Sequence, residues 1–215
     1  MNLTFGIMTI YDDIDRLRQV VDSIRSLNIP NYEIIIAGSY DKFDSDVVPD
    51  LNCRHILCDG WLPRKKNLVA KTANNDILVL THDYYLFDPE WYEGYYRFGD
   101  KWDICSNPQY LLNGKRHFTD WVIWDHPTLP RYHSLHYEDW SQTKYQYVSG
   151  GYFLVKRNFL RDNPISEAMP PGSPEDVEWS LRVRGKAEIV CNPLSTVRHN
   201  KAHRDNGRTG FPYEQ

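Results

Sequence analysis

Three residues with chemically useful side chains follow an apolar stretch of strand length, residues 77–80. Thr81, His82 and Asp83 place a hydroxyl, an imidazole and a carboxylate at the end of a predicted buried strand. Ligands of open α/β sheets bind where parallel strands end, and a carboxylate there can hold a hard cation that binds a diphosphate. The pattern is also typical of a strand followed by an ordinary polar turn, with His82 bonded to the backbone. Other motifs of the chain decide between these two interpretations.

A basic cluster lies at the start of a predicted helix. Arg64, Lys65 and Lys66 follow Pro63 and precede the apolar part of that helix. Cations at a helix start are unfavourable for the helix dipole, which argues against a purely structural reason for the cluster. A bound diphosphate would reverse this cost. A solvated charged turn is the alternative.

An acidic cluster opens a second predicted helix, after a proline-rich loop. Glu175 and Asp176 follow Ser173 and Pro174. The positive end of a helix dipole favours ionised carboxylates, which suits a general base. The alternative needs no substrate: Ser173 is the expected N-cap, and Asp176 occupies the capping-box position.

A folded scaffold must position these groups. In the first ninety residues, the sequence pattern predicts strands that alternate with helices. Strands are expected at residues 3–10, 33–37, 55–58 and 77–80. Apolar positions at helical spacing predict a helix that begins near Asp12 and Asp13 and ends before Asn28, and a second helix covers residues 64–73. This order is typical of a parallel α/β sheet with its loops at the ligand edge.

The second half of the chain predicts a mixed sheet. Asn113-Gly114 indicates a hairpin between residues 109–112 and 116–119, and a further strand is expected at 121–124. A strand-like stretch from 145 to 156 is broken by Ser149-Gly150-Gly151, where the backbone must bend or approach a ligand closely. A last strand is expected at 187–191, and a basic polar tail follows Arg198.

The composition argues against several classes of protein. The chain has 215 residues with 41% hydrophobic content, which suits one domain with a substantial core. A net charge of −4 gives no general attraction to nucleic acid, and the apolar runs are far shorter than a membrane span. The four cysteines form no CxxC pair, so neither a zinc site nor a disulfide framework is indicated, and we expect a reducing cytosol.

Taken in order along the chain, these motifs resemble those of nucleotide-sugar glycosyltransferases with the GT-A fold. The resemblance extends from Leu3 to about His199. It rests on Thr9-Ile10-Tyr11, Gly38-Ser39-Tyr40-Asp41, Lys66-Asn67, Thr81-His82-Asp83, Gly150-Gly151, Glu175-Asp176 and His199. The chain is also similar to the first domain of multidomain glycosyltransferases encoded by large algal viruses, which implies that it is part of a larger enzyme in the host cytoplasm.

The resemblance implies an α/β fold in which helices flank a Rossmann-like mixed sheet, in one domain of residues 1–215. Residues 1–90 would form the nucleotide-binding half. Residues 91–199 would form the acceptor and catalytic half. Residues 200–215 would form a basic tail that becomes ordered over the ligand.

The donor implied by the resemblance is a nucleotide sugar, most simply a UDP-sugar. Base and ribose recognition would involve Tyr11, Ser39 and Asp41, for which ordinary turn formation is the alternative explanation. The diphosphate would lie near Lys66 and Asn67. The full set of donor-binding candidates is Thr9, Tyr11, Gly38, Ser39, Asp41, Arg64, Lys66, Asn67, Thr81, His82 and Asp83.

A divalent cation is expected because the departing nucleoside diphosphate gains negative charge. The resemblance implies that Asp83 and His199 hold this cation, and the imidazole favours Mn²⁺ over Mg²⁺. Thr81 stands where the family has the first Asp of its DxD motif, so the metal affinity is expected to be lower. For His199 the alternative is a surface histidine, with His203 or Arg204 as the phosphate contact.

In inverting members of the family, the matching acidic pair supplies the base that deprotonates the acceptor hydroxyl. The resemblance implies Asp176 for this role, or Glu175 if Asp176 is used in the helix cap. Aromatic faces suit sugars, so four tryptophans are acceptor-site candidates: Trp121, Trp124, Trp140 and Trp179. The implied function is the inverting, metal-assisted transfer of a hexose or deoxyhexose from a UDP-sugar to a hydroxyl of a glycan or glycoprotein.

Two other functions are open. A nucleotidyltransferase that makes a nucleotide sugar would be expected to have a glycine-rich basic loop after the first strand, whereas residues 9–13 are acidic. A carbohydrate-binding domain without turnover is the non-enzymatic alternative. This non-enzymatic alternative stays open because Thr81, at the position of the first Asp of the DxD motif, carries no charge.

Overall fold

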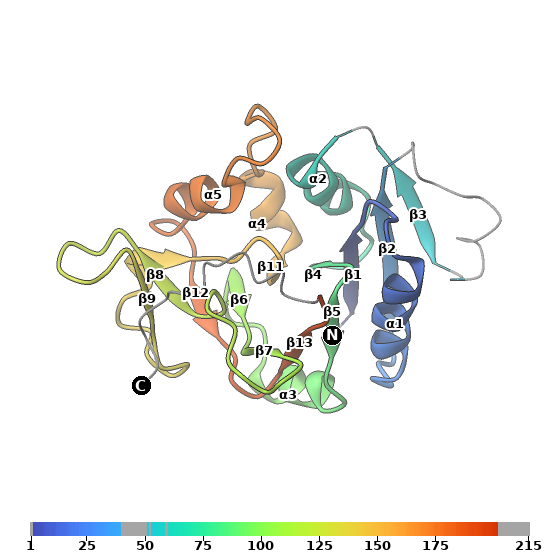
Figure 1. Cartoon of the computed structure of the whole chain (residues 1–215), viewed down its shortest axis with the longest axis horizontal. Coiled ribbons are helices and arrows are strands. Elements are labelled where there is room, and N and C mark those ends of the chain that lie inside the picture. The colour runs from blue at the N-terminus through green and yellow to red at the C-terminus, as the bar shows by residue number, and fades with distance from the viewer. Residues whose placement is uncertain (1, 40–50, 52, 59, 202–215) are drawn as a thin grey trace.

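The computed structural model describes residues 2–39, 51, 53–58 and 60–201. Its largest sheet contains β1 (Leu3–Met8), β2 (Tyr32–Gly38), β3 (Arg54–Leu57), β4 (Ile77–His82), β6 (Ile104–Ser106), β11 (Tyr152–Lys156) and β12 (Ile189–Cys191). The strand order is β12-β6-β11-β4-β1-β2-β3 (Figure 1). β1 is parallel to β2 and β4, whereas β11 is antiparallel to β4 and β6. The sheet is therefore parallel in the first half of the chain and mixed in the second, as the sequence predicts.

Two smaller sheets complete the second half. One consists of β8 (Val122–Trp124), β9 (Tyr132–Ser134) and β10 (Gln146–Tyr147), which follows the short 3₁₀ helix η3 (Thr143–Tyr145). The other consists of β5 (Tyr85–Phe87), β7 (Gln109–Leu111) and β13 (Val197–His199). β13 pairs with both β5 and β7, so the end of the described chain returns to the segment that follows β4.

Helices cover both faces of the large sheet. They are α1 (Ile14–Arg25), α2 (Leu62–Thr72), α3 (Trp91–Phe98), α4 (Arg157–Asp162) and α5 (Glu175–Val183). Phe5 and Ile7 of β1 share one core with α1 and α3, whereas Leu78 and Leu80 of β4 share the other with α2, α4 and α5. The latter three helices gather along the top of Figure 1. Burial on both faces explains why β1 and β4 are apolar at successive positions.

The predicted α/β class with a mixed sheet is confirmed. Asp13 is the N-cap of α1, where its carboxylate accepts a hydrogen bond from Arg16 N. The turn at residues 113–114 is present, but its arms are joined by a single bridge between Tyr110 and Arg116, and β7 pairs with β13 instead. None of the helices in the described part of the chain has the length and apolar character that a membrane crossing requires.

Two boundaries differ from the prediction and change the position of site residues. β4 continues to His82, so Thr81 lies inside the strand and its side chain is fully buried. The predicted cap of α5 is wrong: Pro174 is the N-cap and makes no side-chain cap hydrogen bond. Asp176 is therefore not used in a capping box. The reason is a tertiary one, because its carboxylate is bound elsewhere.

The packing of α3 gives a stability prediction. A Cβ atom added at Gly94 would lie 2.0 Å from the carbonyl oxygen of Leu194, and this backbone atom cannot move aside cheaply. We expect Gly94→Ala to lower the free energy of unfolding by about 1–3 kcal/mol, despite the higher helix propensity of alanine. Urea unfolding measures this, with Gly185→Ala as the control because a Cβ there meets nothing within 4 Å. Equal stability of Gly94→Ala and the wild type would contradict the packing.

Candidate functional site

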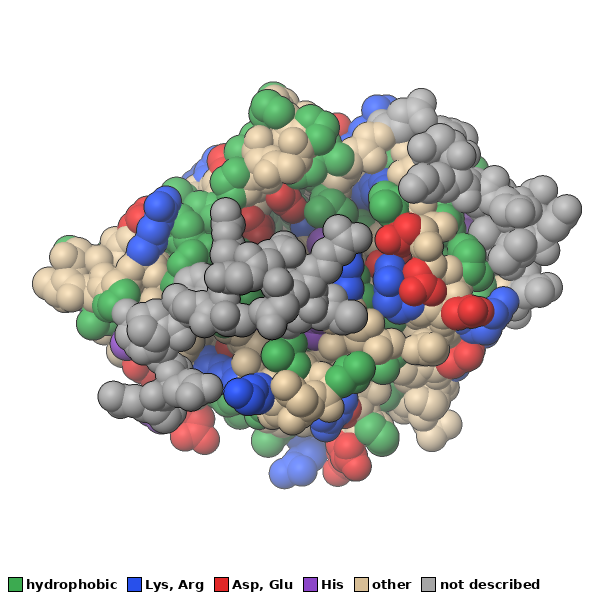
Figure 2. Space-filling model, viewed as in Figure 1, with side chains coloured by type: hydrophobic (Ala, Val, Ile, Leu, Met, Phe, Trp, Pro, Cys, Tyr) green, Lys and Arg blue, Asp and Glu red, His purple; other side chains and the backbone are tan. Residues whose placement is uncertain are grey.

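Several strand ends and helix starts meet at one edge of the large sheet. β1, β2 and β4 end there, and β11 begins there because it is antiparallel to β4. The edge is held together by backbone hydrogen bonds from His82 N to Gly151 O and from Asp83 N to Met8 O. The starts of α2 and α5 contact each other through the pair Lys66–Glu175. Figure 2 shows acidic, basic and histidine side chains close together in the hollow at the middle of this face.

Asp83 is a buried carboxylate that follows β4 directly. Its Oδ2 accepts a hydrogen bond of 2.5 Å from the Thr9 hydroxyl, at the end of β1. Arg16 of α1 places Nη2 3.6 Å from Oδ1 and donates from Nε to the Asp83 carbonyl oxygen. Burial raises the pKa of Asp83 above its ordinary value, although the Thr9 hydrogen bond and the Arg16 charge act in the opposite direction. The structure therefore brings the predicted residues Thr9 and Asp83 into direct contact.

Lys65 joins the ends of β1 and β2. Its buried Nζ donates to Thr9 O at 2.7 Å and to Ser39 Oγ at 2.8 Å. The sequence candidates named Arg64 and Lys66 on either side of it and omitted Lys65. A helix turns by about 100° per residue, so only one of three successive side chains can face a given strand end. This periodicity is the signal that could have found Lys65.

Tyr11 and Gly38 fit against each other beside Lys65. A Cβ at Gly38 would lie only 2.0 Å from the Tyr11 ring, so glycine is required for this packing. Tyr11 itself has a left-handed backbone (φ 57°), an uncommon conformation for a residue of its size, and its N–H donates to Thr9 Oγ1. Thr9, Tyr11, Gly38 and Ser39 thus form one wall of the site. Asp41, the remaining candidate of this group, lies outside the described residues.

Lys66 and Glu175 form a buried ion pair. Lys66 Nζ lies 3.2 Å from Glu175 Oε1, and the two side chains are 0% and 9% exposed. The pair connects residues 109 positions apart in sequence. Because each charge compensates the other, Glu175 is a poor base and Lys66 is not a freely available cation.

Asp176 has a different environment from its neighbour. Its Oδ2 accepts a hydrogen bond of 2.6 Å from the Tyr147 hydroxyl and one of 3.1 Å from Gly150 N. A Cβ at Gly150 would lie 2.9 Å from the Asp176 Cβ, so this glycine permits the close approach that the broken strand at 149–151 indicated. The carboxylate is held rigidly, has no cationic partner among the described residues and faces the same edge as Asp83.

The four tryptophans that were candidates for the acceptor site differ in burial and in their neighbours. Trp121 and Trp179 are fully buried core residues, and Trp140 is exposed and contacts Phe98. Trp124 belongs to a small aromatic cluster with Tyr132 and Tyr147, whose hydroxyl binds Asp176. Of the four tryptophans, Trp124 is the one that this cluster links to Asp176.

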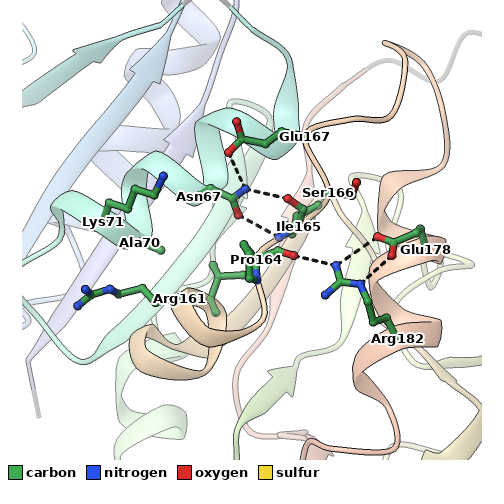
Figure 3. Close-up of a pocket in the computed structure, with 11 residues that line it drawn as sticks. Asn67, Ala70, Lys71, Arg161, Pro164, Ile165, Ser166, Glu167, Glu178 and Arg182 are labelled. Atoms are coloured by element: carbon green, nitrogen blue, oxygen red, sulfur yellow. Dashed lines mark hydrogen bonds and ion pairs between the residues drawn. The ribbon is translucent and has the colours of Figure 1, made fainter.

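Asn67 faces away from the site. The Asn67 amide exchanges hydrogen bonds of 2.8 and 3.0 Å with the backbone of Ile165 and donates to Glu167 (Figure 3). It fixes the loop that precedes α5 beside a groove of about 630 Å³. Arg64 is exposed, and its aliphatic part lies beside Gly60. The side chain of Thr81 is fully buried, and its hydroxyl donates a hydrogen bond of 3.0 Å to the carbonyl oxygen of His82.

Histidines and tyrosines occupy the centre of the edge. His82 Nδ1 lies 2.5 Å from the Tyr84 hydroxyl, and burial together with the charges of Lys66 and Lys201 holds the pKa of His82 well below its ordinary value. The Tyr84 ring lies 4.7 Å from the ring of His199, measured between centroids. His199 also stacks on His117 at 5.1 Å. His199 is therefore an ordered, half-buried residue, while His203 and Arg204 lie outside the described residues.

The donor set for a metal ion is small. In the described part of the chain, no group of three or more His, Cys, Asp or Glu side chains is arranged to hold a metal. Asp83 offers one carboxylate, and His199 is the imidazole that the sequence pairs with it. These residues do not fit a metal centre built from protein alone. A cation at Asp83 would have to take most of its ligands from the phosphates of a nucleotide.

Comparison with known proteins identifies the fold. No family model matches the chain, and no curated protein matches its sequence. The crystal structure of TarS 1-349 from S. aureus matches with a TM-score of 0.66 and 14% identity, over 91% of this chain and 60% of that chain. TarS is a glycosyltransferase of the GT-A type. The chain has the GT-A fold.

The GT-A fold expected from the motifs is thus confirmed, and other structures of TarS agree. The complex with UDP-GlcNAc has a TM-score of 0.67 and 13% identity, over 94% of this chain and 59% of that chain. The complex with UDP has a TM-score of 0.66 and 13% identity. The chain spans about 60% of TarS 1-349 and 37% of a longer TarS structure.

The buried pair Lys66–Glu175 gives a second stability prediction. Lys66→Met leaves the Glu175 carboxylate buried without its partner, so we expect a loss of about 3–5 kcal/mol in the free energy of unfolding. The double variant Lys66→Met/Glu175→Gln has no unpaired charge and should recover much of that loss. Urea unfolding of the cycle measures the coupling. Strictly additive losses would show that the two side chains do not interact.

Arg18→Met is the matched control for this cycle. It breaks an exposed pair with Asp15, in which the side chains are 41% and 86% exposed. We expect this variant to change stability by no more than about 1 kcal/mol.

Proposed function

We propose that the chain is a glycosyltransferase that moves a sugar from a nucleotide sugar, in the simplest case a UDP-sugar, to a hydroxyl of a glycan acceptor. One observation carries the proposal. On a GT-A fold, the same sheet edge holds the buried Asp83 and Lys65, both bonded to Thr9, and the separate carboxylate of Asp176, bonded to Gly150. A transferase needs both parts, one for the leaving nucleotide and one for the attacking hydroxyl.

The donor is proposed to lie along the ends of β1, β2 and β4. Tyr11, Gly38 and Ser39 would contact the base and ribose, and Lys65 would face the phosphates from the start of α2. Thr9 orients the Asp83 carboxylate through its hydrogen bond. The complexes of TarS with UDP and UDP-GlcNAc support a uridine nucleotide as the donor, because their folds match this chain over more than nine-tenths of its length.

A divalent cation is proposed as the cofactor, with Mn²⁺ or Mg²⁺ held by Asp83 and His199. When bound, such an ion would neutralise charge on the departing diphosphate. The residues of the chain act alongside it: Lys65 supplies a fixed positive charge, and Arg16 keeps the Asp83 carboxylate in place. Since Thr81 adds no second carboxylate, we expect weak binding of the ion without the nucleotide.

Asp176 is proposed as the general base. Glu175 is already paired with Lys66, whereas Asp176 is held only by neutral donors: Tyr147 and Gly150 N bind Oδ2, and Val177 N binds Oδ1. Its charge is therefore not cancelled, and it would accept the proton of the acceptor hydroxyl. A base that deprotonates the acceptor hydroxyl from the face opposite the leaving diphosphate leads to inversion at the anomeric carbon. Trp124, Tyr132 and Tyr147 would form the adjacent acceptor wall, which favours a carbohydrate.

The first test addresses the donor side. We expect wild-type protein with Mn²⁺ to release UDP from a UDP-sugar, and EDTA to abolish the release. Asp83→Ala should lower the rate at least about 100-fold, since it removes the carboxylate from the proposed ion site. Asp15→Ala, an exposed carboxylate on α1, is the control. Full activity of Asp83→Ala would contradict the donor site, and pyrophosphate release from UTP would instead indicate a nucleotidyltransferase.

The second test addresses the base. Asp176→Asn can keep one oxygen as the acceptor for Tyr147 and Gly150 N, and it gives up the acceptor of Val177 N. Its amide accepts a proton poorly, so kcat should fall about 100- to 10,000-fold while UDP affinity is unchanged. Steady-state transfer rates and UDP titration measure the two quantities. Asp162→Asn, an exposed change at the end of α4, is the control. Retained transfer by Asp176→Asn would remove the assignment.

A further inference from the structure

His82 carries a buried polar atom that the protein does not satisfy. The Nδ1 atom of its imidazole lies 2.5 Å from the Tyr84 hydroxyl, but Nε2 is buried and has no hydrogen-bond partner among the described residues. Buried polar atoms nearly always have a partner in protein, water or ligand. His82 is the last residue of β4 and directly precedes Asp83 of the proposed donor site. The hydrogen-bonding chemistry of Nε2 therefore indicates which group of a ligand would bind to it.

The hydrogen-bond count shows which nitrogen carries a proton. If the Tyr84 hydroxyl donates to Nδ1, the proton of a neutral imidazole resides on Nε2 and only that N–H is unpaired. If Nδ1 donates instead in a neutral ring, the Nε2 lone pair and the Tyr84 hydroxyl proton are both unpaired in the described part of the chain. The first arrangement leaves fewer buried groups unsatisfied. In a charged ring both nitrogens are donors, so Nε2 is a donor in that case too.

The surroundings of His82 suit a negatively charged acceptor. The positive charges that act on this imidazole are, in order of strength, Lys66 of α2, Lys201 beyond β13, His199 and Lys65. Lys201 Nζ lies 5.3 Å from the centre of the Tyr84 ring. Glu175 compensates Lys66, but no such carboxylate pairs with Lys201 among the described residues. A donor N–H in a region of positive potential favours a phosphate oxygen over a neutral sugar hydroxyl.

We propose that His82 donates a hydrogen bond from Nε2 to the diphosphate of the nucleotide, and that Tyr84 is the positioning residue that keeps the proton on that nitrogen. This role rests on the proposed function and goes beyond it, because it names the atom that contacts the phosphates and the residue that fixes its state. Lys65 and the cation at Asp83 provide charge, whereas His82 provides a directed donor.

The binding test uses the whole chain with Mn²⁺ present and measures the affinities of UDP and of uridine by NMR titration. His82→Phe retains a ring of similar size but has no donor. We expect it to weaken UDP binding about 10- to 100-fold, as for loss of one hydrogen bond to a charged group, and to leave uridine binding unchanged. His136→Phe makes the same chemical change at an exposed histidine after β9 and should bind UDP normally.

A spectroscopic test needs no substitution at His82. The ¹⁵N shifts and couplings of the imidazole distinguish a protonated Nε2 from a protonated Nδ1. We expect the wild type to show Nε2–H with an unprotonated Nδ1. Tyr84→Phe removes the hydroxyl that selects this state, so the ring should become a mixture of tautomers, with a smaller loss of UDP affinity than in His82→Phe. A merely structural role of Tyr84 would leave the tautomer unchanged.

The outcomes separate this proposal from the proposed function. A wild-type chain that binds no UDP contradicts the function and this role of His82 with it. A wild type that binds UDP, together with a folded His82→Phe that binds it equally well, overturns only the role of His82. Wild-type Nε2 without a proton also overturns it. So does a loss confined to the UDP-sugar with UDP binding intact, because the contact would then be to the sugar.

Discussion

The buried pair Lys66–Glu175 is the interaction on which the site depends. It links the start of α2, in the first half of the chain, to the start of α5, in the second. Because these two charges satisfy each other, it is the neighbouring residues that contact the strand ends. Lys65 turns to the ends of β1 and β2, and Asp176 turns to the loop before β11. One ion pair thus positions a cation on the donor side and a carboxylate on the acceptor side.

Tyrosine hydroxyls fix two further groups of the site. Tyr147 donates to Asp176, and Tyr84 bonds to His82. Burial raises the pKa of both phenols, so they stay protonated and act as neutral, constant hydrogen-bond partners. A neutral partner orients a carboxylate or an imidazole without cancelling its charge. This distinguishes Asp176 from Glu175, which a lysine neutralises.

The sequence predicted the helices and strands whose signals are local. It did not predict the side-chain contacts between residues far apart in the chain. β1, β4 and the start of α1 follow from apolar runs and from Asp13 as a cap, which depend only on neighbouring residues. The Asp176 environment depends on Tyr147, 29 residues away, so the local capping pattern with Ser173 was misleading. Thr81 was misplaced because β4 runs two residues further than its apolar run. The Asn67 contacts are likewise tertiary.

The central claim is that the ends of β1, β2 and β4 bind the diphosphate of a nucleotide donor. A crystal structure of the chain with UDP and Mn²⁺ tests it most directly. The account predicts that the diphosphate lies between Lys65 and His82, with the ion on Asp83 and the base near Tyr11. UDP bound in the groove beside Asn67, or with its phosphates directed away from Asp83, would contradict the account.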